Sequence, residues 1–207
     1  MKETFLFICL VLSFVLSANL SLAEDPKGLL IDDFEGPIRG GIDGTVDFGA
    51  GGGSLVEVSG SRAIKFSGEQ AVKVTYEAVM GGYMWVARGY DLNVKGAGCW
   101  RVLPSEIDWK NYSAISFYMY GENSHTKVAF DLKDNGSEMW RFTVEDNFIG
   151  WRKIICPFEE FFARTGWQPN DADRNLVLDF PIKSFQFEPL PEGKGCLYFD
   201  CVGVVKK

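Results

Sequence analysis

Apolar residues recur at every second position in several short segments of the chain. From residue 115 to 119, and again from residue 128 to 132, large apolar residues alternate with smaller or more polar ones. Successive side chains of a strand point to opposite faces of its sheet. This spacing therefore predicts strands that bury one face and leave the other polar.

A turn signal joins two of these predicted strands, 127–133 and 138–144. Between them stands Asp134-Asn135-Gly136-Ser137, and an Asn-Gly pair favours a tight hairpin because both residues tolerate a positive φ. We predict an antiparallel pair on which Asp131 and Arg141 share a face. A charged couple beside aromatic residues is suited to binding something polar.

Other short segments add strands, and none shows a sustained helical period. Residues 158–163 fit one helical turn, whereas the segment 36–53, with its eight glycines, and residues 164–181 are predicted loops. About ten short strands punctuated by Gly, Asn and Pro favour an all-β fold, a two-sheet jelly-roll β-sandwich. One further strand is predicted to begin at Leu29. The others cover 71–77, 83–90, 151–156, 183–188 and 195–205.

The N-terminus has the features of a secretory signal in the usual order. A basic residue at Lys2 precedes a mostly apolar run from Phe5 to Leu16, and small residues lead to Ala23. We predict cleavage after Ala23, which leaves residues 24–207 as one secreted or periplasmic domain without a membrane span. A transmembrane anchor is the alternative, but a span needs about 20 apolar residues and this run is shorter.

Charge and cysteine content narrow the expected partners. Residues 1–23 hold one lysine and one glutamate, so the mature chain keeps the formal net charge of −7. Nucleic acid is therefore not an expected partner, because phosphate binding needs a basic surface. The mature chain has four cysteines without a zinc-binding spacing, which we expect to be buried free thiols: Cys99, Cys156, Cys196 and Cys201. Cys196 and Cys201 lie five apart in one predicted strand and so point to opposite faces.

The order of several short motifs resembles that of the family 11 carbohydrate-binding modules, a galactose-binding-like β-jelly roll. Val79-Met80-Gly81-Gly82 carries a more distant resemblance to the complex I intermediate-associated protein 30 group. The motifs shared with family 11 span residues 29–205 in the family's order. They are Ile31-Asp32-Asp33-Phe34-Glu35-Gly36, Gly82-Tyr83, Asp108-Trp109, Ile115-Ser116-Phe117, Glu138-Met139-Trp140, Gly150-Trp151-Arg152-Lys153-Ile154, Pro157-Phe158-Glu159-Glu160-Phe161, Trp167-Gln168-Pro169 and Leu197-Tyr198-Phe199-Asp200.

Modules of that family bind β-glucan chains in a cleft on the concave sheet, through tyrosines, acids and an arginine. The resemblance implies that the same contacts come here from Tyr83, Asp131, Arg164 and Trp167, with the tryptophan at a family tyrosine position. The chain departs from the family at Gly166, where the family has an aspartate, and at Pro189, near a cleft tyrosine.

Sugars present apolar C–H faces and many hydroxyls, so a binding surface needs aromatic platforms beside bidentate polar groups. Sandwich cores also consume aromatic residues, and we expect Trp85 and Trp140 to be core residues. Trp167, in a polar loop, is expected to contact the ligand. Further candidate platforms are Tyr83, Tyr118 and Tyr120, and the candidate polar groups are Asp131, Arg141, Arg164, Gln186 and Glu188.

Three acids suggest a structural calcium ion. Asp33 and Glu35 lie near the N-terminal strand, and Asp200 lies on the last strand, which commonly runs beside the first in such jelly rolls. Converging carboxylates suit Ca²⁺, which takes six to eight oxygen ligands. The alternative interpretation is that these are solvated acids at strand ends.

Catalysis has little support in the sequence. The single histidine, His125, is expected in a solvated turn, and no Gly-x-Ser-x-Gly elbow exists. A glycosidase needs two carboxylates across a bond, and Glu69, Asp131, Asp179 and Glu188 leave such a pair open. We therefore predict a secreted, non-catalytic module that binds a polysaccharide or oligosaccharide. A protein-interaction or assembly factor and a small glycoside hydrolase are the alternatives, and the oligomeric state is left open.

Overall fold

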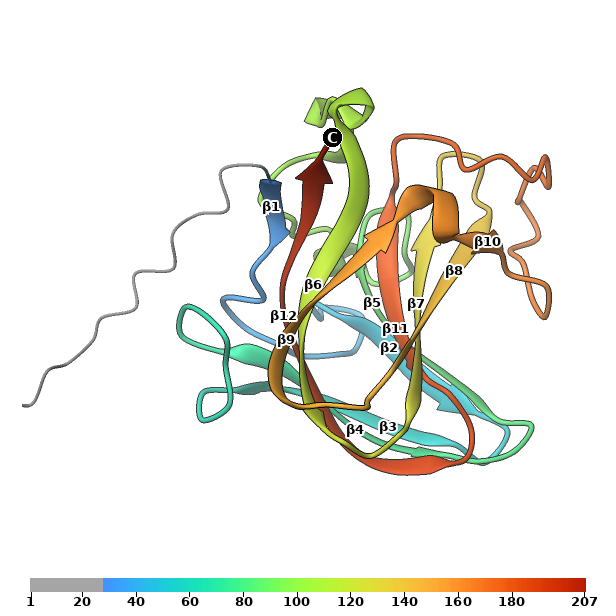
Figure 1. Cartoon of the computed structure of the whole chain (residues 1–207). Coiled ribbons are helices and arrows are strands. Elements are labelled where there is room, and N and C mark those ends of the chain that lie inside the picture. The colour runs from blue at the N-terminus through green and yellow to red at the C-terminus, as the bar shows by residue number, and fades with distance from the viewer. Residues whose placement is uncertain (1–27) are drawn as a thin grey trace, which may run out of the picture.

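The computed structural model describes residues 28–207, which form a sandwich of two antiparallel sheets (Figure 1). The predicted all-β jelly-roll sandwich is confirmed. The strands are β1 (Gly28–Asp32), β2 (Asp47–Gly51), β3 (Leu55–Ser61), β4 (Ala71–Ala78), β5 (Tyr83–Gly89), β6 (Tyr112–Glu122), β7 (Lys127–Lys133), β8 (Met139–Glu145), β9 (Ile149–Pro157), β10 (Phe162–Ala163), β11 (Ser184–Pro189) and β12 (Gly193–Lys206). Four 3-10 turns lie in the connections: η1 (Lys95–Ala97), η2 (Pro104–Glu106), η3 (Trp109–Asn111) and η4 (Phe158–Glu160).

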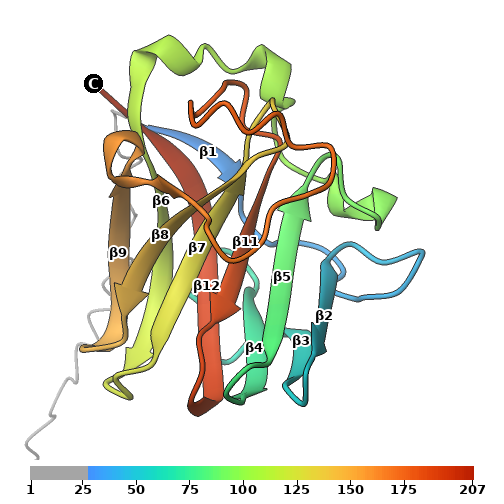
Figure 2. The ribbon, with the colours of Figure 1, turned by 90° about the vertical axis from the view of Figure 1, so that its right-hand side faces the viewer.

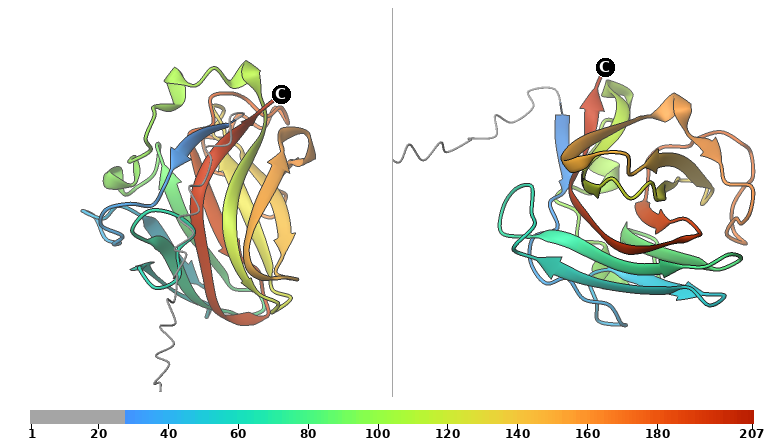
Figure 3. Two further views of the ribbon diagram at one scale, coloured as in Figure 1. Left: turned by 60° about the vertical axis from the view of Figure 1, so that its left-hand side comes forward. Right: turned by 60° about the horizontal axis from the view of Figure 1, so that its bottom comes forward.

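The long last strand organises the first sheet, here called sheet 1. Its order is β3-β4-β12-β6-β9, with β1 as a further partner of β12. Residues 193–199 of β12 pair with β4, and residues 202–205 pair with β1. In the left view of Figure 3, β1 (blue) therefore lies beside β12 (red), with β6 (yellow-green) on the other side of β12. The second sheet, sheet 2, has the order β10-β8-β7-β11-β5-β2.

The core lies between the sheets and is built from alternate strand positions. On β7, Val128, Phe130 and Leu132 face inward, as the period of two predicts. Phe187 of sheet 2 stacks on Phe199 of sheet 1, with ring centroids 3.9 Å apart and planes 9° apart. Burial of each such side chain stabilises the fold by about 1.5–3 kcal/mol. The residues that alternate with these core residues therefore lie on the outer face of sheet 2.

Three strands lie where the sequence predicts none. β2 lies inside the glycine-rich segment 36–53, β3 follows it, and β10 replaces the end of the predicted helical turn at 158–163. The hydrophobic pattern does not reveal β2, because glycines, Gly49 and Gly51, occupy two of its three outward positions. The remaining predicted strands are confirmed to within a few residues.

The predicted hairpin is confirmed, and its register sets Asp131 directly opposite Arg141. Its turn differs in detail from the prediction. The residue with positive φ is Ser137 (64°), not either member of the Asn-Gly pair. Asp134 accounts for this, because its Oδ1 accepts the N–H of Glu138 at 2.8 Å and its carbonyl accepts the N–H of Ser137. A side chain thus closes the turn.

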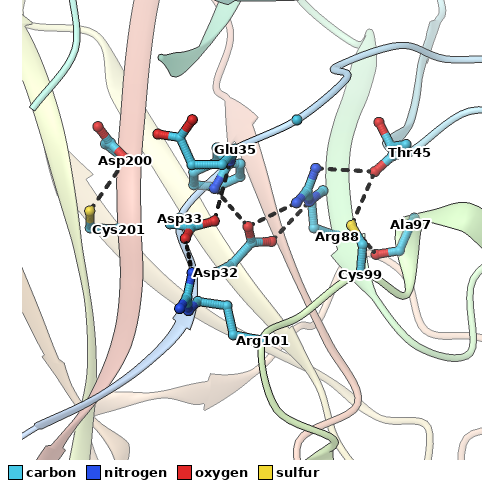
Figure 4. A network of polar contacts seen from close by, with 12 residues as sticks. Asp32, Asp33, Glu35, Thr45, Arg88, Ala97, Cys99, Arg101, Asp200 and Cys201 are labelled. Atoms are coloured by element: carbon cyan, nitrogen blue, oxygen red, sulfur yellow. Dashed lines mark hydrogen bonds and ion pairs between the residues drawn. The ribbon is translucent and has the colours of Figure 1, made fainter. Parts of the chain in front are cut away.

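A buried ion pair links the first strand to sheet 2. Arg88, on the inward face of β5, donates two hydrogen bonds of 2.9 and 2.8 Å to the carboxylate of Asp32, and both side chains are almost fully buried (Figure 4). The Arg88 guanidinium also donates to the carbonyl of Thr45 and lies 5.2 Å from the centroid of the Phe34 ring. This bidentate pair satisfies the one cation among the inward residues of β5.

The cysteines and the histidine follow the predictions in part. All four cysteines within residues 28–207 are free thiols, and Cys156 is buried as predicted. The prediction is wrong for Cys99, which is exposed in the connection between β5 and β6, and for Cys196 and Cys201, which are only half-buried. Burial raises the pKa of Cys156 above its usual range. His125 lies in an exposed turn, as predicted, with Nδ1 2.8 Å from Oε1 of Glu145.

Candidate functional site

A cleft of about 950 Å³ lies over the outer face of sheet 2. Its floor comes from β8, β7, β11, β5 and β2, which face the viewer in Figure 2. The loop between β10 and β11 passes in front of β7 and β11 and forms one wall, and residues 91–93 after β5 form part of the other. The residues that line the cleft therefore come from strands across the whole width of sheet 2.

Two arginines and two acids form a charged lattice in the floor. Nε of Arg141 lies 2.7 Å from Oδ1 of Asp131, and Nη2 of Arg141 lies 2.8 Å from Oδ2. Arg164 lies 3.3 Å from Asp131 and 3.1 Å from Glu188, and Arg141 also contacts Glu188. Gln186 donates to Asp131 at 3.3 Å. Cross-strand register explains the gathering, since Asp131 stands opposite both Arg141 and Gln186.

The lattice combines full burial of its acids with charge balance. Asp131 is 0% exposed and Glu188 is 5% exposed, while both arginines are only partly covered. Burial raises the pKa of Glu188 above its ordinary value, although Arg164 and Arg141 act in the opposite direction. Burial alone would lower the pKa of Arg141, but its hydrogen bonds and charges from Asp131 and Glu188 outweigh this and raise it. Two cations and two anions leave the lattice without net charge.

Tyr83 and Trp85 form an aromatic wall at the β2 side of the cleft. They point outward from β5 at alternate positions, with ring centroids 6.3 Å apart and planes 14° apart. Tyr83 is 55% exposed. The indole Nε1 of Trp85 donates to Oδ1 of Asp47 at 2.9 Å, which fixes the orientation of the ring.

Trp167 lies on the opposite wall, in the loop after β10. It is 55% exposed, and the guanidinium of Arg164 lies 5.6 Å from its ring centroid. Gln168 fastens this loop to β8: its Oε1 accepts the N–H of Met139 at 2.7 Å, and its Nε2 donates to the carbonyls of Met139 and Arg164, both at 2.9 Å. One amide side chain thus holds the segment that presents the arginine and the indole.

The structure brings all seven residues predicted to bind carbohydrate to one face. Five line the cleft, and Asp131 and Glu188 lie directly beneath two of those five, the arginines. The five are Tyr83, Arg141, Arg164, Trp167 and Gln186. Their role in binding stays a prediction at this point.

Of the two tryptophans assigned to the core, only Trp140 lies there. It is 7% exposed, and its Nε1 donates to Asp134. The prediction is wrong for Trp85, which lines the cleft because it shares the outward positions of β5 with Tyr83. The alternation of Tyr83 and Trp85 with two apolar residues was the signal for this. No pattern indicates Gln168, whose role depends on the path of its loop.

Tyr118 and Tyr120 do not belong to the cleft. They lie on β6 in sheet 1, on the outer face, where Tyr118 stacks with Phe66 at 3.5 Å and Tyr120 packs edge-on against Trp151. As candidate platforms for a ligand in the same cleft they are therefore wrong.

The three acids predicted to hold calcium bind separate protein groups. Asp33 pairs with Arg101, and Oε1 of Glu35 accepts the N–H of Glu69 at 2.8 Å. Asp200 accepts two other backbone N–H groups, those of Phe66 and Ser67, from the same loop between β3 and β4 that holds Glu69. Figure 4 shows Asp33, Glu35 and Asp200 in one region of the fold. Within residues 28–207, no group of three or more His, Cys, Asp and Glu side chains is arranged to hold a metal ion, and calcium stays a prediction.

Asp200 makes the stability of the protein depend on pH. Burial raises its pKa from 3.8 to about 6, against the hydrogen bonds it accepts from Ser67 and Phe66. The folded state binds the carboxyl proton of Asp200 more tightly than the unfolded state does. Protonation of Asp200 therefore stabilises the folded state below the unfolded pKa, and this stabilisation is lost as the pH rises through about 6.

We therefore expect Asp200→Asn to be more stable than the wild type at pH 7, by about 1–3 kcal/mol, because it removes a buried charge. At about pH 4 the advantage should largely disappear. Urea unfolding of both proteins at the two pH values measures this. A variant that is less stable than the wild type at pH 7 would show that the ionised carboxylate is worth more to the loop than its desolvation costs.

The model of the family described as "Carbohydrate binding domain (family 11)" matches residues 23–206. No curated protein matches the chain. Within the described residues, no helix is long and apolar enough to cross a membrane, and the predicted signal segment lies outside those residues.

Several solved structures share the fold. The chain is similar to a family 11 module from Clostridium thermocellum in complex with a β-1,3-1,4-mixed-linked tetrasaccharide (23% identity, 87% of this chain and 95% of that chain covered, TM-score 0.66). It is also similar to the family 11 module of a cellulosomal cellulase of the same organism (19% identity, 87% of this chain and 95% of that chain covered, TM-score 0.65). A β-1,2-glucanase from Parabacteroides distasonis is more distant (14% identity, 78% of this chain and 23% of that chain covered, TM-score 0.51). Because the family model matches nearly the whole chain, the protein belongs to carbohydrate-binding module family 11.

Proposed function

We propose that this chain is a non-catalytic module that binds a β-linked glucan, or a related polysaccharide, in the cleft over sheet 2. The observation that carries the proposal is the union, in one cleft, of exposed aromatic faces on both walls and a rigid set of hydrogen-bonding side chains between them. The mixed-linked tetrasaccharide bound to a structurally similar family 11 module supports β-glucan as the ligand class.

The lattice suits a neutral sugar. A guanidinium carries five N–H donors, and Nη1 of Arg141 makes none of the bonds to Asp131 and Glu188 described above. Such donors are held in place before the ligand arrives, which lowers the entropy cost of binding. Because the acids already neutralise both arginines, the floor offers hydrogen bonds without a net charge that would favour an acidic sugar.

The same lattice argues against the glycosidase alternative. Of the acids that the sequence left open as a catalytic pair, Asp131 and Glu188 do lie on one face of sheet 2. Both are nearly or fully buried beneath Arg141 and Arg164. A general acid and a nucleophile must reach opposite sides of a glycosidic bond, and carboxylates bonded to two guanidiniums are not presented in that way.

Affinity electrophoresis tests the proposed function. The mature chain should migrate more slowly through native gels that contain mixed-linkage β-glucan than through plain gels. A bovine albumin standard in the same lanes corrects for the viscosity of the gel. Equal mobility of the chain in plain gels and in gels with β-glucan, xylan or mannan would favour the alternative of a protein-interaction factor.

Gln168 offers a sharper test of how the cleft is held. Gln168→Glu keeps an acceptor for the N–H of Met139 but loses both N–H donors, and sets a carboxylate against the carbonyls of Met139 and Arg164. An unmade buried hydrogen bond costs about 1–3 kcal/mol, so we expect affinity for β-glucan to fall about tenfold. Gln168→Met, which removes the bonds without adding charge, should lose less. Affinity for β-glucan equal to that of the wild type in Gln168→Glu would contradict this role for the amide.

Secretion completes the proposal. A polysaccharide ligand lies outside the cytoplasm, and the predicted signal at residues 1–23 would deliver the domain there. Sequencing the N-terminus of protein recovered from the culture medium or the periplasm would identify the mature start, which the proposal places at Glu24.

A further inference from the structure

The turn between β7 and β8 contains a chemically labile pair of residues that does not line the cleft. Asn135 and Gly136 are the two central residues of this turn, which the N–H of Ser137 closes by donating to the carbonyl of Asp134 at 3.2 Å. Asn135 is the only asparagine of the chain that precedes a glycine. Asparagine is thermolabile because its side-chain amide reacts with the backbone nitrogen of the next residue, and glycine has no side chain to shield that nitrogen.

Both reacting groups of this pair are available. Asn135 is exposed. Within residues 28–207, neither its side chain nor the N–H of Gly136 takes part in a hydrogen bond. The backbone nitrogen of Gly136 therefore has no bond to break before it reacts with the neighbouring side chain.

Two comparable pairs elsewhere in the chain differ in this respect. Asp43 is exposed and precedes Gly44, but the N–H of Gly44 donates to a backbone carbonyl at 2.9 Å. Asn123 precedes Ser124, whose N–H donates to Oδ2 of Asp146 at 3.0 Å. A nitrogen in such a bond must lose a favourable contact before it can react. The structure thus distinguishes Asn135 from both Asp43 and Asn123.

The labile pair lies where the hairpin contacts the loop between β10 and β11. The N–H of Asn135 donates to the carbonyl of Asp179 at 3.1 Å, and the carbonyl of Gly136 accepts the N–H of Asp173 at 2.9 Å. The carboxylate of Asp173 packs on Gly136 so closely that a Cβ atom there would lie 2.5 Å from Oδ2. Packing against the loop therefore requires glycine at the position that makes Asn135 labile.

This contact between the turn and the loop is rich in acids. Asp134 and Glu138 are almost fully buried, and burial raises the pKa of both. The side-chain amide of Asn175 bridges two more acids, Asp173 at 2.9 Å and Asp179 at 2.8 Å. A further carboxylate in the turn would be a like charge beside these groups, and like charges at short range repel one another.

We propose that Asn135 is a site of spontaneous deamidation, which releases the β10–β11 loop from the hairpin. The backbone nitrogen of Gly136 forms a bond to the side-chain carbonyl carbon of Asn135, and the bond from that carbon to the amide nitrogen breaks. The proton of the Gly136 N–H leaves with the amide as ammonia, so that a succinimide ring remains. Water then opens the ring at either carbonyl, which gives aspartate or isoaspartate.

Both products weaken the contact with the loop. Each adds a carboxylate to the acid-rich contact, and isoaspartate also lengthens the main chain of the turn by one carbon. That extra carbon displaces the carbonyl that accepts the N–H of Asp173. The same loop carries Arg164 and Trp167, so the modification acts on a wall of the cleft.

Peptide mapping by mass spectrometry tests the site. Folded protein, residues 24–207, is kept at mildly alkaline pH and sampled over time. Asn135 should be converted before any other asparagine, and an isoaspartyl methyltransferase should detect isoaspartate at position 135 and not at Asp43. Asn135→Gln is the control and should stay unmodified at this position. Conversion at Asn123 or Asp43 as fast as at Asn135 would overturn the proposed site.

Hydrogen exchange tests the release of the loop. The backbone N–H groups of Asp173, Leu176 and Asp179 donate to the turn. In the converted protein they should exchange about tenfold faster than in fresh protein, because loss of one or two hydrogen bonds corresponds to that factor. Asn135→Asp adds the charge without the longer main chain and should show a smaller increase. The amides of β4, in sheet 1, should exchange at an unchanged rate.

Two results would contradict the inference. Unchanged exchange in the loop after complete conversion of Asn135 would overturn the release of the loop. Conversion of Asn135 in urea but not in the folded protein would show that the fold protects the pair, which overturns the site itself. Neither measurement involves a glycan, so a failure of the proposed function would leave this inference standing.

Discussion

Arg141→Ala is expected to lower the free energy of unfolding by about 3–5 kcal/mol, which is the range for breaking a buried ion pair by removing one partner. Arg141 makes both short hydrogen bonds to Asp131, which is 0% exposed, and a further contact to Glu188. Without it, Arg164 at 3.3 Å is the remaining cation beside Asp131. The cost comes from two acids that stay buried with half of their counter-charge.

Two controls identify the cause of this loss. Arg141→Lys retains the charge but not the planar fork that fits a carboxylate, so it should lie between the wild type and the alanine variant. Acidification from pH 7 to about pH 5 should narrow the difference in stability between Arg141→Ala and the wild type. Burial raises the pKa of Glu188, and this carboxyl no longer needs a cation once it is protonated. Urea unfolding at both pH values gives these numbers. A loss below about 1 kcal/mol at pH 7 would mean that the lattice behaves as a solvated surface pair.

Trp167→Ala is expected to weaken binding of β-glucan by about 10- to 100-fold while changing stability by less than about 0.5 kcal/mol. The indole is 55% exposed and stands on the wall opposite Tyr83 and Trp85. An exposed ring contributes little to the core, so its removal should affect the ligand and not the fold. Arg164, which lies against the ring face, should keep its bonds to Asp131 and Glu188.

Leu176→Ala is the matched control for this variant. Leu176 belongs to the same loop between β10 and β11, is 70% exposed and does not line the cleft. Its removal should leave the affinity for β-glucan unchanged. Equal losses of affinity in the two variants would show that the loop as a whole, and not the indole, determines binding.

The sequence predicts the fold well because this fold uses the signals that sequence displays. Strands such as β6 and β7 bury one face, and their period of two follows from that burial. The pattern does not reveal β2, because two of its three outward positions are Gly49 and Gly51, which leave room for the rings of Tyr83 and Trp85 on β5. A strand with glycines at its outward positions shows no alternation of apolar and polar side chains.

The residues of the candidate site also differ in how far the sequence predicts them. Asp131 and Arg141 can be placed together from the hairpin alone, because register across a short turn is local. Arg164, which follows β10, and Glu188, on β11, reach the same lattice from segments that are distant in sequence. Family resemblance and residue chemistry indicated these two residues, and spacing does not. The sequence wrongly predicts Trp85 to be a core residue, because an aromatic residue among apolar neighbours is usually buried. The glycines of the adjacent strand, which leave room for its ring, are not near it in the sequence. Gln168 acts through three backbone contacts, which no residue pattern encodes.

The most direct test is calorimetric titration of wild-type residues 24–207 with a soluble mixed-linkage β-glucan oligosaccharide. We expect saturable heat that fits one site per chain, because the cleft over sheet 2 combines both aromatic walls with the charged lattice. Xylan and mannan oligosaccharides should bind more weakly in the same experiment. A titration with no heat for any of these glycans, on protein shown to be folded by cooperative thermal unfolding, would contradict the assignment of this cleft to β-glucan.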